Sequence, residues 1–125
     1  MKLLIVDDEM DLCRLLADHF EEHFDAKTFV ATTPRDALRL LEEHQPEGML
    51  LDLNLRSRLN GFDILGKVAA LSPATKVIMV TSDHEFASVE RALELGAVDY
   101  ITKPFAVGYL EQTVDLKIAK HLIDA

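Results

Sequence analysis

The chain has 125 residues, 49% of them hydrophobic, and a formal net charge of -9 at pH 7. This length fits one domain, residues 1–125, with a single sizeable core, and the apolar content is too high for a disordered chain. The negative charge argues against direct binding to nucleic acid or to an anionic membrane, because both would repel it.

The chain's one cysteine, Cys13, cannot form an internal disulfide, which favours a reducing cytoplasm as its location. Its position in an amphipathic helical pattern predicts a small, buried, apolar side chain. The first apolar run, Leu3–Val6, is far shorter than a signal peptide's core or a membrane span. We therefore expect a protein that does not associate with membranes.

Short apolar runs alternate along the chain with helical patterns. The predicted strands are Leu3–Val6, Ala26–Ala31, Met49–Leu53, Lys76–Val80 and Val98–Ile101. Near-continuous apolar strands that alternate with helices predict a parallel sheet covered on both faces. Right-handed crossovers and a reversal of strand order then place a site at the carboxyl ends of the strands.

A helix is predicted after each strand. The first has one apolar face, which consists of Leu12, Leu15, Leu16, His19 and Phe20. Thr33 and Pro34 are a typical cap and first residue for the second helix, and Gly61 ends the loop before the third. The last helix has a core-facing stripe of Val107, Leu110, Val114, Ile118 and Leu122.

Polar residues lie at or just after the carboxyl ends of four of the five predicted strands. They are Asp7, Asp8, Asp52, Thr81 and Lys103. If these strands are parallel neighbours, all five side chains converge on one edge of the sheet. Carboxylates gathered in this way repel one another unless a cation lies among them. The pattern predicts a magnesium-assisted phosphoryl acceptor with Asp52 as the nucleophile.

Each of these residues also has a simpler interpretation. Either Asp7 or Asp8 can cap the helix that follows. Backbone amides alone can satisfy a buried aspartate such as Asp52. Thr81 can be an ordinary β-branched strand residue, and Lys103 can be a solvated surface lysine. Two successive aspartates, however, exceed what one cap requires.

Four stretches resemble the receiver domain of bacterial two-component response regulators, and together they extend over essentially the whole chain. They are Leu4–Glu9, Leu50–Leu53, Val77–Ser82 and Ala92–Phe105, in order and at the family's spacings. The resemblance implies a flavodoxin-like, doubly wound α/β fold with a five-stranded parallel sheet and five helices. The implied strand order, 2-1-3-4-5, is that of chemotaxis receivers and does not follow from the residues themselves.

The resemblance also implies a bound Mg²⁺. Asp8 and Asp52 would bind the ion directly, the backbone carbonyl of Asn54 would supply a further ligand, and Asp7 would act through a water molecule. Oxygen ligands with retained waters suit magnesium, and the lack of nearby cysteine or histidine pairs argues against zinc.

Further roles follow from the same resemblance. Asp52 would accept a phosphoryl group from a phosphohistidine donor, while Thr81 and Lys103 would contact that group. A cis peptide bond before Pro104 would direct the lysine side chain. Thr81 and Tyr100 would form the conformational switch, although a half-exposed tyrosine packed on the edge strand remains the simpler interpretation of Tyr100.

Two positions are expected to tune the lifetime of the phosphorylated state. Asn54 lies two residues after Asp52, and Asp83 lies two residues after Thr81. In the family these positions flank the approach of the hydrolytic water, although surface polarity alone also explains both residues.

The loop after Asp52 departs from the family pattern. It lacks the usual proline, and its glycine, Gly61, comes one residue late. Arg56 and Arg58 also make the loop more cationic than usual. These arginines either contact a phosphoryl group, steer an acidic donor surface, or are simply solvated.

A second apolar stripe on the last helix suggests an interface. Tyr109, Leu116 and Ile123 recur every seven residues, opposite the core-facing stripe. We expect a homodimer contact or the seat of an output domain there, the alternative being scattered exposed apolar residues.

The sequence thus favours a phosphoacceptor signalling switch, which is not an enzyme acting on an external product. Its expected partner is a sensor histidine kinase or a histidine phosphotransfer domain, and its expected output surface comprises the fourth helix, fifth strand and fifth helix. A magnesium-dependent phosphohydrolase would need a second aspartate at the position of Asn54. A docking module without phosphorylation would lack one of the key residues, and a flavodoxin-type binder would not need the acidic cluster.

Overall fold

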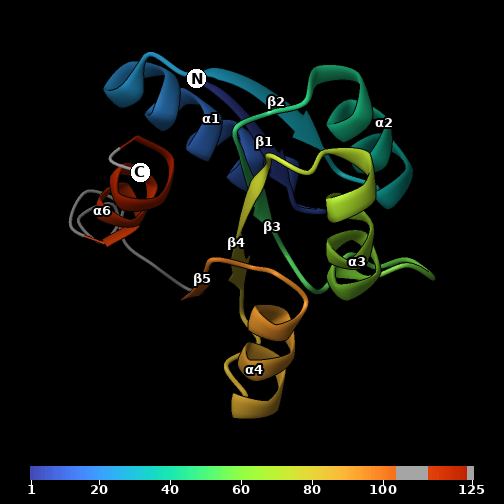
Figure 1. The fold of residues 1–125 in the computed structure, drawn as a ribbon. Helices are drawn as coiled ribbons and strands as arrows, with labels where there is room; N and C mark the ends of the chain where they lie inside the picture. Colours follow the sequence, from blue (N-terminus) through green and yellow to red (C-terminus); the bar gives the residue numbers. More distant parts are fainter. Residues whose placement is uncertain (104–112, 124–125) are drawn as a thin grey trace.

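The computed structural model describes residues 1–103 and 113–123. Five parallel strands form one sheet in the order β2-β1-β3-β4-β5, which confirms the predicted fold and strand order (Figure 1). The strands are β1 (Lys2–Val6), β2 (Lys27–Ala31), β3 (Gly48–Leu51), β4 (Lys76–Thr81) and β5 (Asp99–Thr102).

Helices cover both faces of the sheet, with α1 and α6 on one face and α2 and α3 on the other (Figure 1). The helices are α1 (Met10–Phe24), α2 (Pro34–His44), α3 (Gly61–Leu71), α4 (Phe86–Glu94) and α6 (Asp115–Ile118), which continues as a π-helical segment, η2 (Ala119–Ile123). Thr33 caps α2 as predicted, because its hydroxyl oxygen accepts a hydrogen bond from the backbone N–H of Asp36 at 3.2 Å. No helix in the described part of the chain is long and apolar enough to span a membrane.

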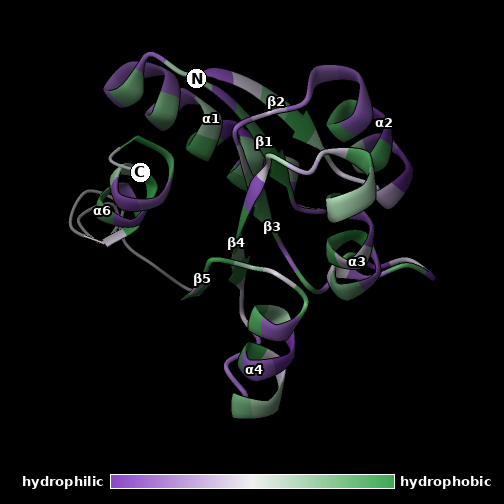
Figure 2. Ribbon diagram, in the orientation of Figure 1, coloured by the Kyte–Doolittle hydropathy of each residue, from purple (hydrophilic) through white to green (hydrophobic). Residues whose placement is uncertain are grey.

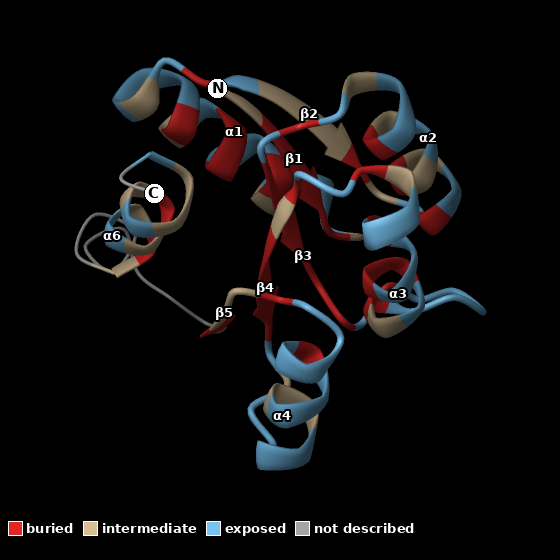
Figure 3. Ribbon diagram, viewed as in Figure 1, coloured by how far each residue is buried: buried red, intermediate tan, exposed pale blue. Residues whose placement is uncertain are grey.

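The strands bury side chains on both faces, since successive residues of a strand point to opposite sides. Leu3 and Ile5 of β1 pack in the cluster beneath α1 and α6, whereas Leu4 and Val6 pack in the cluster beneath α2 and α3. The central strand β3 is hydrophobic along its length (Figure 2) and buried throughout (Figure 3). This double burial explains why β1, β3 and β4 are nearly continuous apolar runs with no polar alternation.

The bounds of all five predicted strands differ from the observed ones by one or two residues, and one helical residue was wrongly predicted to be buried. Strand β3 ends at Leu51, not Leu53, because the chain turns there and the Leu53 carbonyl accepts a hydrogen bond from the N–H of Gly61 at 3.0 Å. Leu15 is 50% exposed, since the buried face of α1 is centred on Cys13, Leu16, Ala17 and Phe20. The buried position of Cys13 is as predicted.

The described part of the last helix matches the predicted stripes. Val114 and Ile118 are buried, and Leu122 packs against the same cluster. On the opposite side, Leu116 is 65% exposed and Ile123 is 52% exposed. The remaining stripe residues, Val107, Tyr109 and Leu110, lie outside the described residues.

Hydrogen bonds and an ion pair connect this C-terminal segment to the rest of the fold. Asp115 pairs with His19 of α1 at 2.7 Å. Asp99 of β5 pairs with Lys117 at 2.6 Å and with His121 at 2.9 Å. Burial alone would raise the pKa of Asp99, but hydrogen bonds from Lys117, the Tyr100 N–H and His121 outweigh burial and lower it.

Gly61 begins α3 in close contact with the chain that follows β3. A Cβ atom at this position would lie 2.4 Å from the backbone oxygen of Asp52 and 2.7 Å from the Cα of Leu53. Replacement of Gly61 by alanine should therefore lower the free energy of unfolding by about 1–3 kcal/mol, measured by urea denaturation.

Gly66 provides the matched control for this prediction, because it lies in the same helix and a Cβ there would meet nothing within 4 Å. Gly66→Ala should stabilise the protein by about 0.5–1 kcal/mol through helix propensity. Equal effects of the two substitutions would contradict the steric explanation.

Candidate functional site

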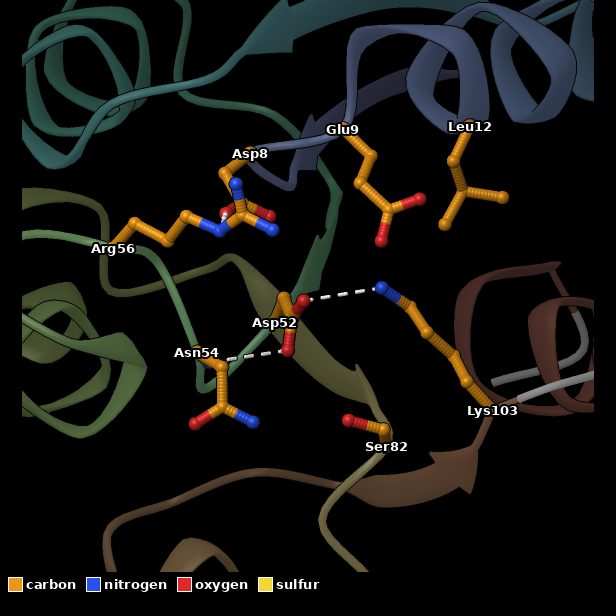
Figure 4. A pocket seen from close by; sticks show the side chains of 8 residues that line it. All are labelled: Asp8, Glu9, Leu12, Asp52, Asn54, Arg56, Ser82 and Lys103. Atoms are coloured by element: carbon orange, nitrogen blue, oxygen red, sulfur yellow. Dashed lines mark hydrogen bonds and ion pairs between the residues drawn. The ribbon is translucent and has the colours of Figure 1, made fainter.

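The carboxyl ends of four neighbouring strands bring the predicted site residues together. Parallel register pairs Val6 of β1 with Leu51 of β3, so the aspartates that follow these strands lie side by side. The Asp52 N–H donates to the carbonyl of Val6 at 3.0 Å, which extends this register by one residue. Lys103 follows β5 and reaches across to the same place (Figure 4). The convergence predicted from the sequence is present for Asp7, Asp8, Asp52 and Lys103.

Lys103 bridges two of the three aspartates. Its Nζ atom lies 2.5 Å from Oδ2 of Asp7 and 3.0 Å from Oδ2 of Asp52. All three side chains are largely buried, with exposures of 13% for the lysine, 4% for Asp7 and 6% for Asp52. Lys103 is therefore an ion-paired residue of the site, not a solvated surface lysine.

The site carries more negative than positive charge. Oxygen atoms of Asp7, Asp8 and Asp52 lie within 4.8 Å of one another. Burial raises the pKa of Asp7, even though Lys103 donates a hydrogen bond to it. Burial alone would lower the pKa of Lys103, but its contacts with Asp7 and Asp52 outweigh this effect and raise it. One ammonium group shared by two buried carboxylates leaves each of them incompletely compensated.

Each of the two buried aspartates uses one oxygen for the backbone and the other for Lys103. Oδ1 of Asp7 accepts from the N–H of Glu9 at 3.0 Å, and Oδ1 of Asp52 accepts from the N–H of Asn54 at 3.1 Å. The N-cap residue of α1 is Glu9, which makes no side-chain capping bond. Capping of α1 therefore does not account for the two successive aspartates.

A cavity of about 490 Å³ opens beside Asp52. Its lining consists of Asp8, Glu9, Leu12, Asp52, Asn54, Arg56, Ser82 and Lys103 (Figure 4). Glu9 and Leu12 were not predicted as lining residues. Their position in the first turn after Asp8 was the signal that could have identified them, because that turn begins at the edge where the strands end.

Neither predicted switch residue, Thr81 or Tyr100, lines the cavity, but both contact Asp83. Thr81 is fully buried, and its hydroxyl oxygen accepts from the Asp83 N–H at 3.3 Å. The Tyr100 hydroxyl donates to the carbonyl of Asp83 at 2.6 Å, and burial together with the charge of Asp83 raises the pKa of Tyr100 to about 12. Ser82, which is exposed, directs its hydroxyl into the cavity (Figure 4).

The two predicted tuning residues differ in position. Asn54 lines the cavity next to Asp52. The carboxylate of Asp83 instead accepts hydrogen bonds from the Glu85 N–H at 3.0 Å and the Ser88 hydroxyl at 2.8 Å. Asp83 thereby holds the start of α4.

Arg56 makes a contact that the sequence left undecided. Its Nε atom lies 3.1 Å from Oδ2 of Asp8, although 88% of the arginine side chain is exposed. Arg58, in the same loop, is exposed and makes no ion pair with any described residue. The unusual cationic loop was the only signal for this contact, since its path cannot be derived from the sequence pattern.

The donor atoms of this site suit a hard divalent cation. Three carboxylates offer oxygen atoms to one point, and the adjoining cavity has room for water ligands. The nearest thiol, on Cys13, is buried and donates to the carbonyl of Asp7 at 3.4 Å. Burial and the charge of Asp7 raise the pKa of this thiol to about 11.

Comparisons with known proteins show which proteins this chain is similar to. Residues 3–115 match the family model described as the response regulator receiver domain. The chain is 38% identical over 108 residues to a protein-glutamate methylesterase/protein-glutamine glutaminase of Bordetella pertussis, with 83% of this chain and 30% of that protein covered. It is 33% identical over 123 residues to the sensory transduction protein LytR of Streptococcus agalactiae, with coverage of 96% and 47%.

A similar fold occurs in the response regulator domain of Thermotoga maritima CheB. The two structures superpose with a TM-score of 0.83 at 28% identity, over 98% of this chain and 96% of that one. The chain thus spans less than half the length of the two relatives above, and nearly all of a solved regulator domain.

Proposed function

This chain belongs to the response regulator receiver domain family, and on that premise we propose that Asp52 accepts a phosphoryl group from a phosphohistidine donor and thereby switches a signal. Receiver domains are regulatory domains of two-component systems. The observation that carries the proposal is the setting of Asp52, which is buried at the base of an open cavity, is paired with Lys103, and lies beside two further carboxylates.

In the proposed reaction, a carboxylate oxygen of Asp52 attacks phosphorus. The bond between phosphorus and the donor imidazole breaks, and its electron pair leaves with the imidazole nitrogen. Lys103 already contacts Asp52 at 3.0 Å, so its ammonium group is placed to neutralise charge on the transferring phosphoryl oxygens. The product is an acyl phosphate, whose ready hydrolysis suits a timed signal.

We assign the cation ligands as Asp8, Asp52 and the backbone carbonyl of Asn54, with Asp7 acting through water. Mg²⁺ bound there would supply further charge neutralisation at the phosphoryl group. The indirect role of Asp7 follows from the family resemblance, because its two carboxylate oxygens have the same kinds of partner, a backbone N–H and Lys103, as those of Asp52.

Thr81 and Tyr100 are the proposed switch. A turn of the Thr81 hydroxyl toward the phosphoryl group would break its bond with the Asp83 N–H. An inward turn of Tyr100 would break its bond with the Asp83 carbonyl. Thr81 and Tyr100 therefore both bond to Asp83, just before α4, so a movement of either side chain would change the contacts of the same residue. Asn54 and Asp83 are proposed to tune the lifetime of the phosphorylated state.

The proposed partners are a sensor histidine kinase or histidine phosphotransfer domain on the donor side, in the cytoplasm. A second copy or an output domain would bind the exposed stripe that includes Leu116 and Ile123. Residues 1–125 form the proposed receiver unit, which undergoes phosphorylation and dephosphorylation at its own site and turns over no external substrate.

Intact mass spectrometry tests this proposal. After incubation with acetyl phosphate and Mg²⁺, the wild-type protein should gain one phosphoryl group of about 80 Da, whereas incubation with a chelator should give no gain. Reduction of the product with borohydride, which converts an acyl phosphate to an alcohol, should mark the peptide that contains Asp52. No gain in mass with Mg²⁺, or a mark at another residue, would overturn the assignment.

A further inference from the structure

Two different cations compensate the three carboxylates of the site. Lys103 contacts Asp7 and Asp52, whereas Arg56 contacts Asp8. The lysine follows a strand and is 13% exposed, so the fold holds it in place. The arginine extends from the loop between β3 and α3 and is 88% exposed (Figure 4). Water can therefore replace its contact with Asp8 at little cost in free energy.

The contact of Arg56 involves the aspartate that is most open to the cavity. The side chain of Asp8 is 18% exposed, compared with 4% for Asp7 and 6% for Asp52. Its Oδ2 atom lies 3.1 Å from Nε of Arg56. A guanidinium group and a divalent cation cannot occupy the same side of this oxygen, because both are positively charged and would repel each other at contact distance.

We propose that Arg56 competes with the divalent cation for Asp8, so that the cation enters only when the arginine leaves. This inference rests on the proposed function, because it requires Asp8 to be a cation ligand. Arg56 thereby lowers the affinity of the site for Mg²⁺. Cation entry also releases a guanidinium group at the mouth of the cavity, next to the path that a phosphoryl donor must take to Asp52.

The size of the effect follows from the exposure of the pair. An ion pair with one largely exposed partner contributes little in water, so removal of the arginine should tighten Mg²⁺ binding by about two- to fivefold. Apart from its contact with Asp8, the positive charge of Arg56 should affect Mg²⁺ binding less, because physiological salt screens charges that lie more than about 8 Å apart. Arg58 carries the same charge in the same loop but makes no ion pair with any described residue, so replacing it tests the effect of charge without the contact.

NMR titration with Mg²⁺ measures this affinity without any phosphoryl transfer. The backbone N–H of Asn54 is the reporter, because it donates to Oδ1 of Asp52. We expect Arg56→Ala to tighten binding about two- to fivefold. Arg58→Ala, which removes the same charge from the same loop, should change the affinity by less than half as much. Equal effects of the two variants, or no tightening by Arg56→Ala, would overturn the competition.

The same titration separates this inference from the proposed function. Asp8→Asn should abolish binding at the Asn54 reporter if Asp8 is a cation ligand. If the wild type binds no Mg²⁺, the cation site and the competition both fail. If the wild type binds, Asp8→Asn does not, and Arg56→Ala matches the wild type, only the competition fails. Arg56 is largely exposed, so its replacement leaves the fold intact.

Discussion

Replacement of Lys103 by methionine is expected to lower the free energy of unfolding by about 2–4 kcal/mol at pH 7 in the presence of a chelator. The lysine is the common partner of two carboxylates that are nearly buried. Methionine keeps the length of the side chain but leaves Asp7 and Asp52 close together without a cation. Denaturation with urea measures the loss, and an unchanged midpoint would contradict the central role of this ion pair.

The pH dependence of this loss has a definite sign. Burial already raises the pKa of Asp7, and removal of Lys103 takes away the contact that lowers it. A carboxyl group with a raised pKa binds its proton more tightly in the folded state than in the unfolded one. The destabilisation of the variant should therefore shrink as the pH falls from 7 toward 5 and grow as the pH rises. In the wild type, the raised pKa of Lys103 means that its stabilisation is complete below the unfolded pKa and is lost in strong alkali.

Lys117→Met is the control for this experiment. Lys117 also forms an ion pair with an aspartate, Asp99, but at a distance from the site and with greater exposure of both partners. Its replacement should cost about 1 kcal/mol or less. Mg²⁺ should restore stability to the Lys103 variant by compensating the same carboxylates, and it should not restore stability to the Lys117 variant.

Replacement of Asp52 by asparagine should abolish the mass gain from acetyl phosphate and, in a chelator, raise the free energy of unfolding by about 1–2 kcal/mol. The amide has the shape of the carboxylate but no nucleophilic oxygen anion. It also removes one of three negative charges whose oxygens lie within 4.8 Å. Mass spectrometry and urea denaturation of the same preparation measure the two effects together.

Asp99→Asn is the control variant, with the opposite expected effect on the free energy of unfolding. The carboxylate of Asp99 has two side-chain partners, Lys117 and His121, and hydrogen bonds from both help to lower its pKa. Its replacement should destabilise the protein while leaving the mass gain intact. A loss of stability in both variants would show that the ion pair of Asp52 with Lys103 outweighs repulsion among the site carboxylates.

The fold was predictable because its inner strands, β1, β3 and β4, are buried on both sides and form continuous apolar runs. Some of the helices between strands also have a start signal, such as Thr33 and Pro34 before α2. The strand order came from the family resemblance, because hydrophobicity alone does not distinguish one neighbour from another. Leu15 was wrongly predicted to be buried, because a stripe of apolar residues locates the buried face of a helix only to within about one residue.

The candidate site was predictable where residues follow strands, and less so where they lie on loops. Asp7, Asp52 and Lys103 take their positions from the sheet, and their contacts match the expected convergence. The contact of Arg56 with Asp8 depends on the path of a loop, which no periodicity encodes. Burial of the Thr81 hydroxyl likewise depends on how the chain turns into α4.

The loop from residue 54 to residue 60 is fastened at both ends. Leu55 is buried near its start, and a reciprocal pair of hydrogen bonds between Asn60 and Asp63 fixes its end at α3. Because Gly61 has no side chain, the start of α3 can pack directly against the backbone of Asp52. Insertions, deletions and substitutions between these two anchored ends would therefore extend into solvent. They would leave the position of Asp52 unchanged. A protein engineer could graft loops of other lengths and charges between Leu55 and Asn60, and so vary cation and donor preference around an unchanged acceptor.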